Sequence, residues 1–160
     1  MLSKVLKLLE DDSRLTPEQI ATMLDTNAEK IKQLISQAEN DGLILKYKAV
    51  INWDKITDEQ VWALIEVRAN PQMKAGFDAV AKQIYQFPQA RTVMLVSGTY
   101  DLAIVVTANT IREISDFVTR YLAPIEGVEA TTTHFLLKRY KEDGVVLDDT
   151  NKEMRQKVVL

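Results

Sequence analysis

The spacing of apolar residues changes along this 160-residue chain, and that change limits the folds open to it. Up to about residue 40, apolar side chains recur every three or four residues, which is the spacing of amphipathic helices. Beyond residue 60, short runs rich in β-branched residues alternate with two further segments of helical spacing. The sequence therefore predicts an α+β protein with a helical N-terminal domain and a mixed C-terminal domain.

Three short helices are predicted in the first forty residues. The second begins at Thr16, an N-cap that a proline and then a glutamine follow in the pattern of a capping box. The third begins after Asn27 and ends at Gly42. Since only a short turn separates these two helices, the pattern favours a helix-turn-helix, in which the third helix can enter a major groove of DNA. A plain three-helix bundle has the same periodicity and remains open at this point.

An alternating segment follows the third helix. Over Leu43–Ile51, aliphatic residues alternate with lysine and tyrosine, which predicts two short strands around Lys46–Lys48. These strands would form a small β-wing with cationic side chains near its tip. The first domain is accordingly predicted as a winged helix-turn-helix over residues 1–52, and the polar residues 53–60 as a linker.

The remainder predicts the order strand, helix, strand, strand, helix, strand over residues 61–140. The four strand segments are Val61–Arg68, Thr92–Ser97, Leu102–Ala108 and Val128–Tyr140. This order is the ferredoxin-like βαββαβ arrangement, an antiparallel sheet with two helices on one face. Residues that point to either face of the first strand are apolar, so the sheet face without helices also needs a cover. We expect this face to pack on another copy of the chain.

Two segments resemble the Lrp/AsnC, or feast/famine, family of regulators. The first is Ala38-Glu39 followed by Gly42-Leu43-Ile44, where the family commonly has a leucine-glutamate pair, a glycine and two aliphatic residues. The second is Gly98-Thr99-Tyr100-Asp101, matching the glycine, aromatic residue and aspartate in the central hairpin of the family's RAM domain, an ACT-like ferredoxin fold. The resemblance covers residues 1–140, and residues 141–160 form a C-terminal tail without a counterpart.

The resemblance implies a transcription regulator that binds double-stranded DNA. Its candidate contacts lie on the third helix, the helix caps and the wing: Thr16, Asn27, Ala28, Lys30, Lys32, Gln33, Ser36, Gln37, Lys46 and Lys48. The chain departs from the family at Leu34, where the family commonly carries an arginine. The formal net charge of −3 also argues against a protein that coats nucleic acid through bulk positive charge, so DNA binding is expected to be local.

The resemblance also implies a small-molecule effector, an amino acid or a related metabolite, bound by homodimers that can assemble into tetramers or octamers. Its candidate contacts are Gly98, Thr99, Tyr100, Asp101, Thr131, Thr133 and His134. A glycine lets backbone amides approach a carboxylate, and a carboxylate accepts hydrogen bonds from an ammonium group. The residue types alone leave a simple hairpin turn open for the same four loop residues.

Composition narrows the alternatives. The chain has no cysteine and one histidine, so neither a metal site nor a cofactor is expected, and no catalytic residue is assigned. No apolar run approaches the roughly 20 residues of a membrane span, and no export signal is recognisable, which predicts a cytoplasmic protein. The alternative is a siroheme decarboxylase-like enzyme on the same scaffold, which would need His134 and the arginines at positions 91, 112, 120 and 139 around one large pocket.

Overall fold

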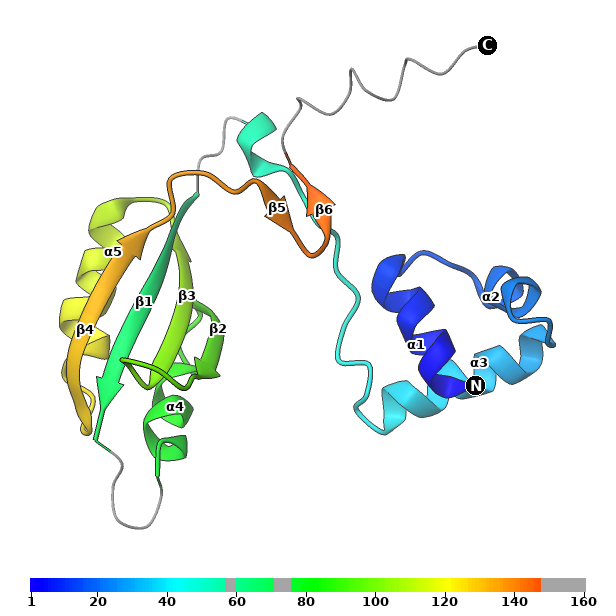
Figure 1. Cartoon of the computed structure of the whole chain (residues 1–160), viewed down its shortest axis with the longest axis horizontal. Helices are drawn as coiled ribbons and strands as arrows, with labels where there is room; N and C mark the ends of the chain where they lie inside the picture. Colours follow the sequence, from blue (N-terminus) through cyan, green and yellow to red (C-terminus); the bar gives the residue numbers. More distant parts are fainter. Residues whose placement is uncertain (57–59, 71–75, 148–160) are drawn as a thin grey trace. The chain divides into compact units, whose positions relative to one another are not determined.

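The computed structural model describes residues 1–56, 60–70 and 76–147, which Figure 1 shows in colours that follow the sequence. The chain divides into two compact units, one over Met1–Val50 and a second from Ile51 onward. Helices alone make up the first unit, and a four-stranded antiparallel sheet with helices makes up the second. The predicted α+β class is confirmed.

The first unit consists of α1 (Leu2–Asp11), α2 (Pro17–Met23) and α3 (Ala28–Asn40). Val5, Ile20 and Ile31, one from each helix, are fully buried at its centre. The turn between α2 and α3 is tight, because Asp25 adopts a positive φ of 49° and the Thr26 N–H donates to the Ala21 carbonyl oxygen over 2.9 Å. The helix-turn-helix geometry expected from the sequence is present.

The strands predicted around Lys46–Lys48 are not formed, which corrects the expectation of a β-hairpin within the chain. Residues 43–52 are described throughout and contain no strand. Leu45 is 87% exposed, so the alternating pattern buries no apolar face here. An isolated two-stranded hairpin is marginal in water, and Leu43–Ile51 lacks the glycine or asparagine that favours a two-residue turn. The Tyr47 hydroxyl instead donates to Glu39 Oε1 at the end of α3 over 2.9 Å.

The sheet of the second unit has the order β2-β3-β1-β4, with each neighbouring pair antiparallel. Its elements are β1 (Val61–Ala69), α4 (Asp78–Ile84), β2 (Ala90–Leu95), β3 (Leu102–Ala108), α5 (Ile111–Phe117), the π-helical turn η2 (Val118–Leu122) and β4 (Val128–Phe135); a short 3₁₀ turn, η1 (Trp53–Lys55), precedes them. The predicted βαββαβ order is confirmed.

The two faces of this sheet differ. Ala63, Ile65 and Val67 are fully buried against the helices, together with alternate residues of β3. The intervening residues form what we call the open face, because among the described residues no helix packs on it: Trp62, Leu64, Glu66, Arg68, Met94, Ala103, Val105, Thr132 and His134. Between Arg68 and Ala69 the pairing of β1 with β4 shifts, as in a β-bulge.

Part of the predicted tail is ordered. Residues 141–146 form a hairpin of β5 (Lys141–Glu142) and β6 (Val145–Val146), visible at the end of the coloured chain in Figure 1. Asp143 and Gly144 take the two positive φ values that its two-residue turn needs. The sequence analysis assigned no element to residues 141–160; residues 141–146 form this hairpin, while 148–160 lie outside the described residues.

Two side-chain contacts hold this hairpin region to the start of the second unit. The Arg139 guanidinium lies over the Trp62 ring at 4.5 Å and pairs with Glu142 at 2.6 Å. The Asn52 amide donates to the Leu147 carbonyl oxygen over 2.8 Å. The chain therefore enters and leaves the second unit at adjoining places.

Candidate DNA and effector sites

The predicted DNA contacts gather on the surface of the first unit. Apart from half-buried Ala28, all of them are exposed, and six lie on α3 or its first turn: Ala28, Lys30, Lys32, Gln33, Ser36 and Gln37. Two others hold helix ends, since Thr16 Oγ1 accepts from the Gln19 N–H and Asn27 Oδ1 accepts from the Lys30 N–H. The surface of α3 offers amide, hydroxyl and ammonium groups of the kinds that read base edges and phosphates.

An acidic residue that the sequence analysis missed stands beside this surface. Glu18 in the first turn of α2 lies 3.3 Å from the Lys32 ammonium. A backbone hydrogen bond, then Lys32 and Thr16, lower the pKa of the Glu18 carboxyl group. Lys32 must therefore exchange this carboxylate for a phosphate if it contacts DNA. Only the packing of α2 against α3 brings the two residues together.

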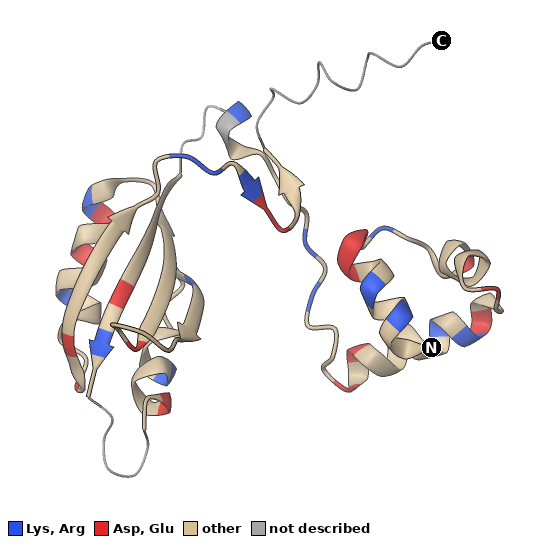
Figure 2. Ribbon diagram, viewed as in Figure 1, with Lys and Arg blue, Asp and Glu red and all other residues tan. Residues whose placement is uncertain are grey.

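Charge on the first unit is mixed rather than uniformly basic. Figure 2 shows basic and acidic residues on both α1 and α3, with the acidic ones of α1 gathered at its end. The sequence places two more basic residues, Lys46 and Lys48, on the segment after α3. The expectation of local rather than bulk electrostatic attraction to DNA fits this distribution. Because no strand forms there, Lys46 and Lys48 lie on a segment without regular secondary structure and not at the tip of a wing.

The Gly98–Asp101 loop joins β2 to β3 and is anchored to the end of β1. Asp101 Oδ2 accepts the Ala69 N–H over 2.8 Å, and the Asp101 N–H donates to the Val67 carbonyl oxygen over 3.0 Å. One carboxylate oxygen thus has a structural role, which the sequence analysis did not foresee. Gly98 is exposed and its φ is not positive, so the backbone there does not require glycine. A Cβ at this position would meet no atom within 4 Å, so the space for a ligand does not depend on the missing side chain either.

The three predicted effector contacts on β4 do not share one face of the sheet. Thr131 and Thr133 pair with Val67 and Ile65, so they face the helices, and they are half-buried. His134 is exposed on the open face, with Nε2 3.3 Å from Glu66 Oε1. Thr131 lies at the end of the sheet where the loop is anchored. The structure therefore brings the loop and Thr131 to one end, and separates His134 from both threonines.

The described parts of the chain contain no group of three or more histidine, cysteine, aspartate or glutamate residues that could hold a metal ion. None of the helices in these parts is long and apolar enough to span a bilayer.

Comparison with known proteins agrees with this architecture. Residues 62–146 match the family model of the Lrp/AsnC ligand binding domain, a range that includes β5 and β6, which the sequence analysis left without a counterpart. An uncharacterized HTH-type transcriptional regulator of Bacillus subtilis, YugG, is 37% identical over 154 residues, which is 96% of this chain and 93% of that protein.

More distant relatives extend the comparison. The leucine-responsive regulatory protein of Rhizobium meliloti is 27% identical over 139 residues, covering 87% of this chain and 88% of that protein. A transcriptional regulator of Neisseria meningitidis, solved as a complex with L-Met, superposes with a TM-score of 0.69 at 20% identity, over 88% of this chain and 90% of that one. The chain belongs to the Lrp/AsnC family of HTH-type transcriptional regulators.

Proposed function

We propose that this protein binds specific DNA sequences through α3 and changes its activity when a small metabolite occupies the second unit. The proposal rests on the α2–α3 pair, in which both helices are capped and α3 has an exposed polar surface. This pair is joined to a domain that matches a ligand-binding family. As a regulator it needs neither a metal nor a cofactor, and it acts in the cytoplasm.

The binding species is a dimer. The open face holds Trp62, Leu64 and Met94, which a second copy can cover, and a two-fold pair of α3 helices reads two half-sites spaced by whole helical turns. Further association into tetramers or octamers would place several such pairs along one DNA segment. Residues 43–50, which lack regular secondary structure, connect the DNA-reading unit to the dimerising unit in each copy.

The effector is an amino acid or a related acid, held at the Gly98–Asp101 loop with Thr131. The complex of the Neisseria relative with L-Met and the name of the Rhizobium relative support this ligand class. Tyr100 and Asp101 are half-buried and border the end of β1, so they offer a ring and a carboxylate oxygen beside exposed backbone. His134 belongs to the open face and would reach this ligand only from a second copy.

The enzymatic alternative finds less support. His134 lies on the open face, whereas Arg112 and Arg120 belong to α5 and η2, which pack on the other face. Arg139 is stacked on Trp62 and paired with Glu142. These residues do not surround one pocket of the kind that an anionic tetrapyrrole needs.

Selection of genomic DNA fragments by the purified full-length protein tests the proposal. We expect an enriched palindromic site that the protein retards in gels, and weaker or less selective retardation for Gln33→Ala. Gln83→Ala on the exposed surface of α4 is a matched control that should leave retardation unchanged. Absence of any enriched sequence, combined with a visible absorbance band after addition of siroheme, would instead support the enzyme.

A further inference from the structure

A pocket of about 500 Å³ lies in the second unit, at the end of the sheet away from the Gly98–Asp101 loop. Its walls come from residues just before β1 and β2, from the end of β3, and from α5 with η2. Gln89 precedes β2 whereas Gly98 follows it, so the pocket and the loop occupy opposite ends of the β2–β3 hairpin. The volume falls within the range of about 300–1,000 Å³ that small-molecule sites occupy.

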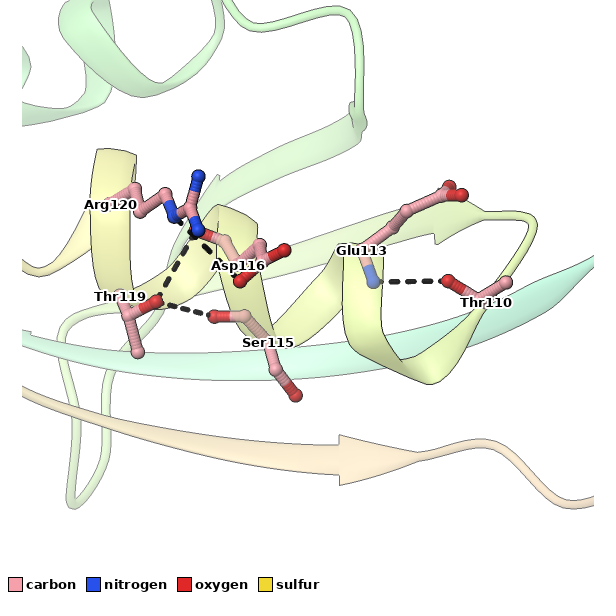
Figure 3. Close-up of polar contacts among 6 residues, drawn as sticks. All are labelled: Thr110, Glu113, Ser115, Asp116, Thr119 and Arg120. Carbon is pink, nitrogen blue, oxygen red and sulfur yellow. Dashed lines mark hydrogen bonds and ion pairs between the residues drawn. The ribbon is translucent and has the colours of Figure 1, made fainter.

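One wall of the pocket carries charged groups at helical spacing. Glu113, Asp116 and Arg120 all line it, and Figure 3 shows their side chains leaving the same side of the helix. Arg120 Nε lies 3.7 Å from Asp116 Oδ1, with the two side chains 68% and 44% exposed. Such a long, exposed pair is weak and exchanges readily for other partners. Two carboxylates against one guanidinium leave the wall with an excess negative charge.

The roles of the two carboxylates differ. Glu113 is occupied in capping α5, because its Oε2 accepts the Asn109 N–H over 3.0 Å while its own N–H donates to Thr110 Oγ1 over 3.1 Å. The Asp116 carboxylate caps no helix end, and its contact within the described residues is the weak pair with Arg120. Asp116 is therefore the carboxylate that can turn toward a bound cation.

Gln89 also lines this pocket and carries a buried acceptor. Gln89 Oε1 is shielded from solvent and has no donor among the described residues, although buried polar atoms nearly always find a partner. Gln89 is held in place by its backbone carbonyl, which accepts the Thr107 N–H over 3.2 Å. A ligand that supplies an N–H to Oε1 would remove this unfavourable state.

The helix geometry supplies an independent sign of a site. Val118–Leu122 forms a π-helical turn, closed by the Ala123 N–H donating to the Val118 carbonyl oxygen over 2.8 Å. Turns of this kind are rare and occur frequently at functional sites. This one carries Tyr121 into the pocket wall, with its ring 6.5 Å from that of Phe117 and 51% of the residue exposed. An aromatic surface therefore adjoins the acceptors.

We propose that this pocket binds a small primary amine with a flat apolar body. The ammonium group donates to the Asp116 carboxylate and to Gln89 Oε1, and the body lies against the Tyr121 ring. The excess negative charge of the wall favours a cation over an anion. The site is separate from the effector site proposed above and gives the regulator a second input.

Calorimetry on the full-length protein tests the site with tyramine and tryptamine as probes, and with 4-hydroxyphenylacetate as the acid that lacks the amine. We expect both amines to bind and the acid not to bind. Asp116→Asn keeps the shape of the side chain and should weaken amine binding about tenfold or more, since a charged hydrogen-bond partner is lost. Asp78→Asn on α4 removes the same charge away from the pocket and should bind like the wild type.

Further variants separate this site from the effector site. Asp101→Ala should leave amine binding unchanged even if it removes the amino-acid response, so failure of either proposal is seen independently of the other. If Asp116→Asn lowers the content of folded protein, Tyr121→Leu tests the pocket instead: it removes the aromatic ring and should weaken binding of both amines. No heat with either amine at millimolar concentration, equal affinity for Asp116→Asn, or equal binding of the acid would overturn the proposal.

Discussion

The Asp101 carboxylate can be assigned two roles, and two substitutions separate them. In the structural role, Oδ2 accepts the Ala69 N–H over 2.8 Å and ties the loop to β1. In the ligand role, the negative charge receives the ammonium group of an effector. Asp101→Asn retains an acceptor oxygen but removes the charge, whereas Asp101→Ala removes both.

The expected magnitudes follow from this geometry. Asp101→Ala leaves the N–H of buried Ala69 without its acceptor, which should lower the free energy of unfolding of the second unit by about 1–2 kcal/mol. For a unit of this size, each 1 kcal/mol corresponds to a fall in Tm of roughly 4–8 °C. Asp101→Asn should lose less than half of that stability, and both variants should lose the calorimetric response to amino acids.

Thermal unfolding followed by circular dichroism, together with titration of the twenty amino acids, measures both effects. Exposed Asp78→Asn serves as the charge control: it should leave amino-acid binding unchanged and lower Tm only slightly, because Asp78 lies in the first turn of α4. If Asp101→Asn unfolds at as low a temperature as Asp101→Ala, the acceptor oxygen is not what stabilises the loop. If both variants still bind an amino acid with wild-type affinity, the effector site lies elsewhere.

Three further predictions concern the first unit. Ile31→Ala should lower the free energy of unfolding of the first unit by about 2–5 kcal/mol, because the Ile31 side chain is fully buried. Denaturant titration that follows the unfolding transition of the first unit measures this change, and an effect below that range would contradict the packing described. Glu18→Gln should strengthen DNA retardation at low salt, since Lys32 no longer has a carboxylate partner, and unchanged retardation would exclude a competition between Glu18 and phosphate. Burial, then the hydrogen bond to Glu39, raise the pKa of Tyr47 above its ordinary value of 10.0. The stability that protonated Tyr47 contributes is therefore present below its pKa in the unfolded chain and is lost as pH rises through its pKa in the folded protein. A spectrophotometric titration should find that Tyr47 ionises at a higher pH in the wild type than in Glu39→Gln.

Local signals in the sequence predicted most of the secondary structure. The Thr16 capping box and the Asn27 cap fix the starts of two helices within a few residues, so their positions do not depend on the rest of the fold. The order of elements in the second unit followed from the change between helical and strand spacing. The sheet register also follows from alternation, which places Thr133 and His134 on opposite faces, a consequence that the grouping of effector residues overlooked.

Other features depend on partners that a local pattern does not contain. The segment after Gly42 alternates like a strand but has no strand beside it, so alternation alone was misleading. The β5–β6 hairpin was missed although its Asp143-Gly144 turn is a recognised hairpin signal, because each strand has only two residues. The Glu18–Lys32 pair joins two helices and has no sequence signature at all.

The β-bulge at Arg68/Ala69 has a consequence for how motion near the effector loop can be observed. The Ala69 N–H is bound by a side chain from another part of the chain and not by a strand carbonyl, so it exchanges with solvent whenever Asp101 moves away. Neighbouring amides in β1 exchange only when the sheet opens. The ratio of exchange at Ala69 to exchange at Val67 therefore reports excursions of the loop in the intact protein, and an effector that holds the loop should slow the first rate while leaving the second alone.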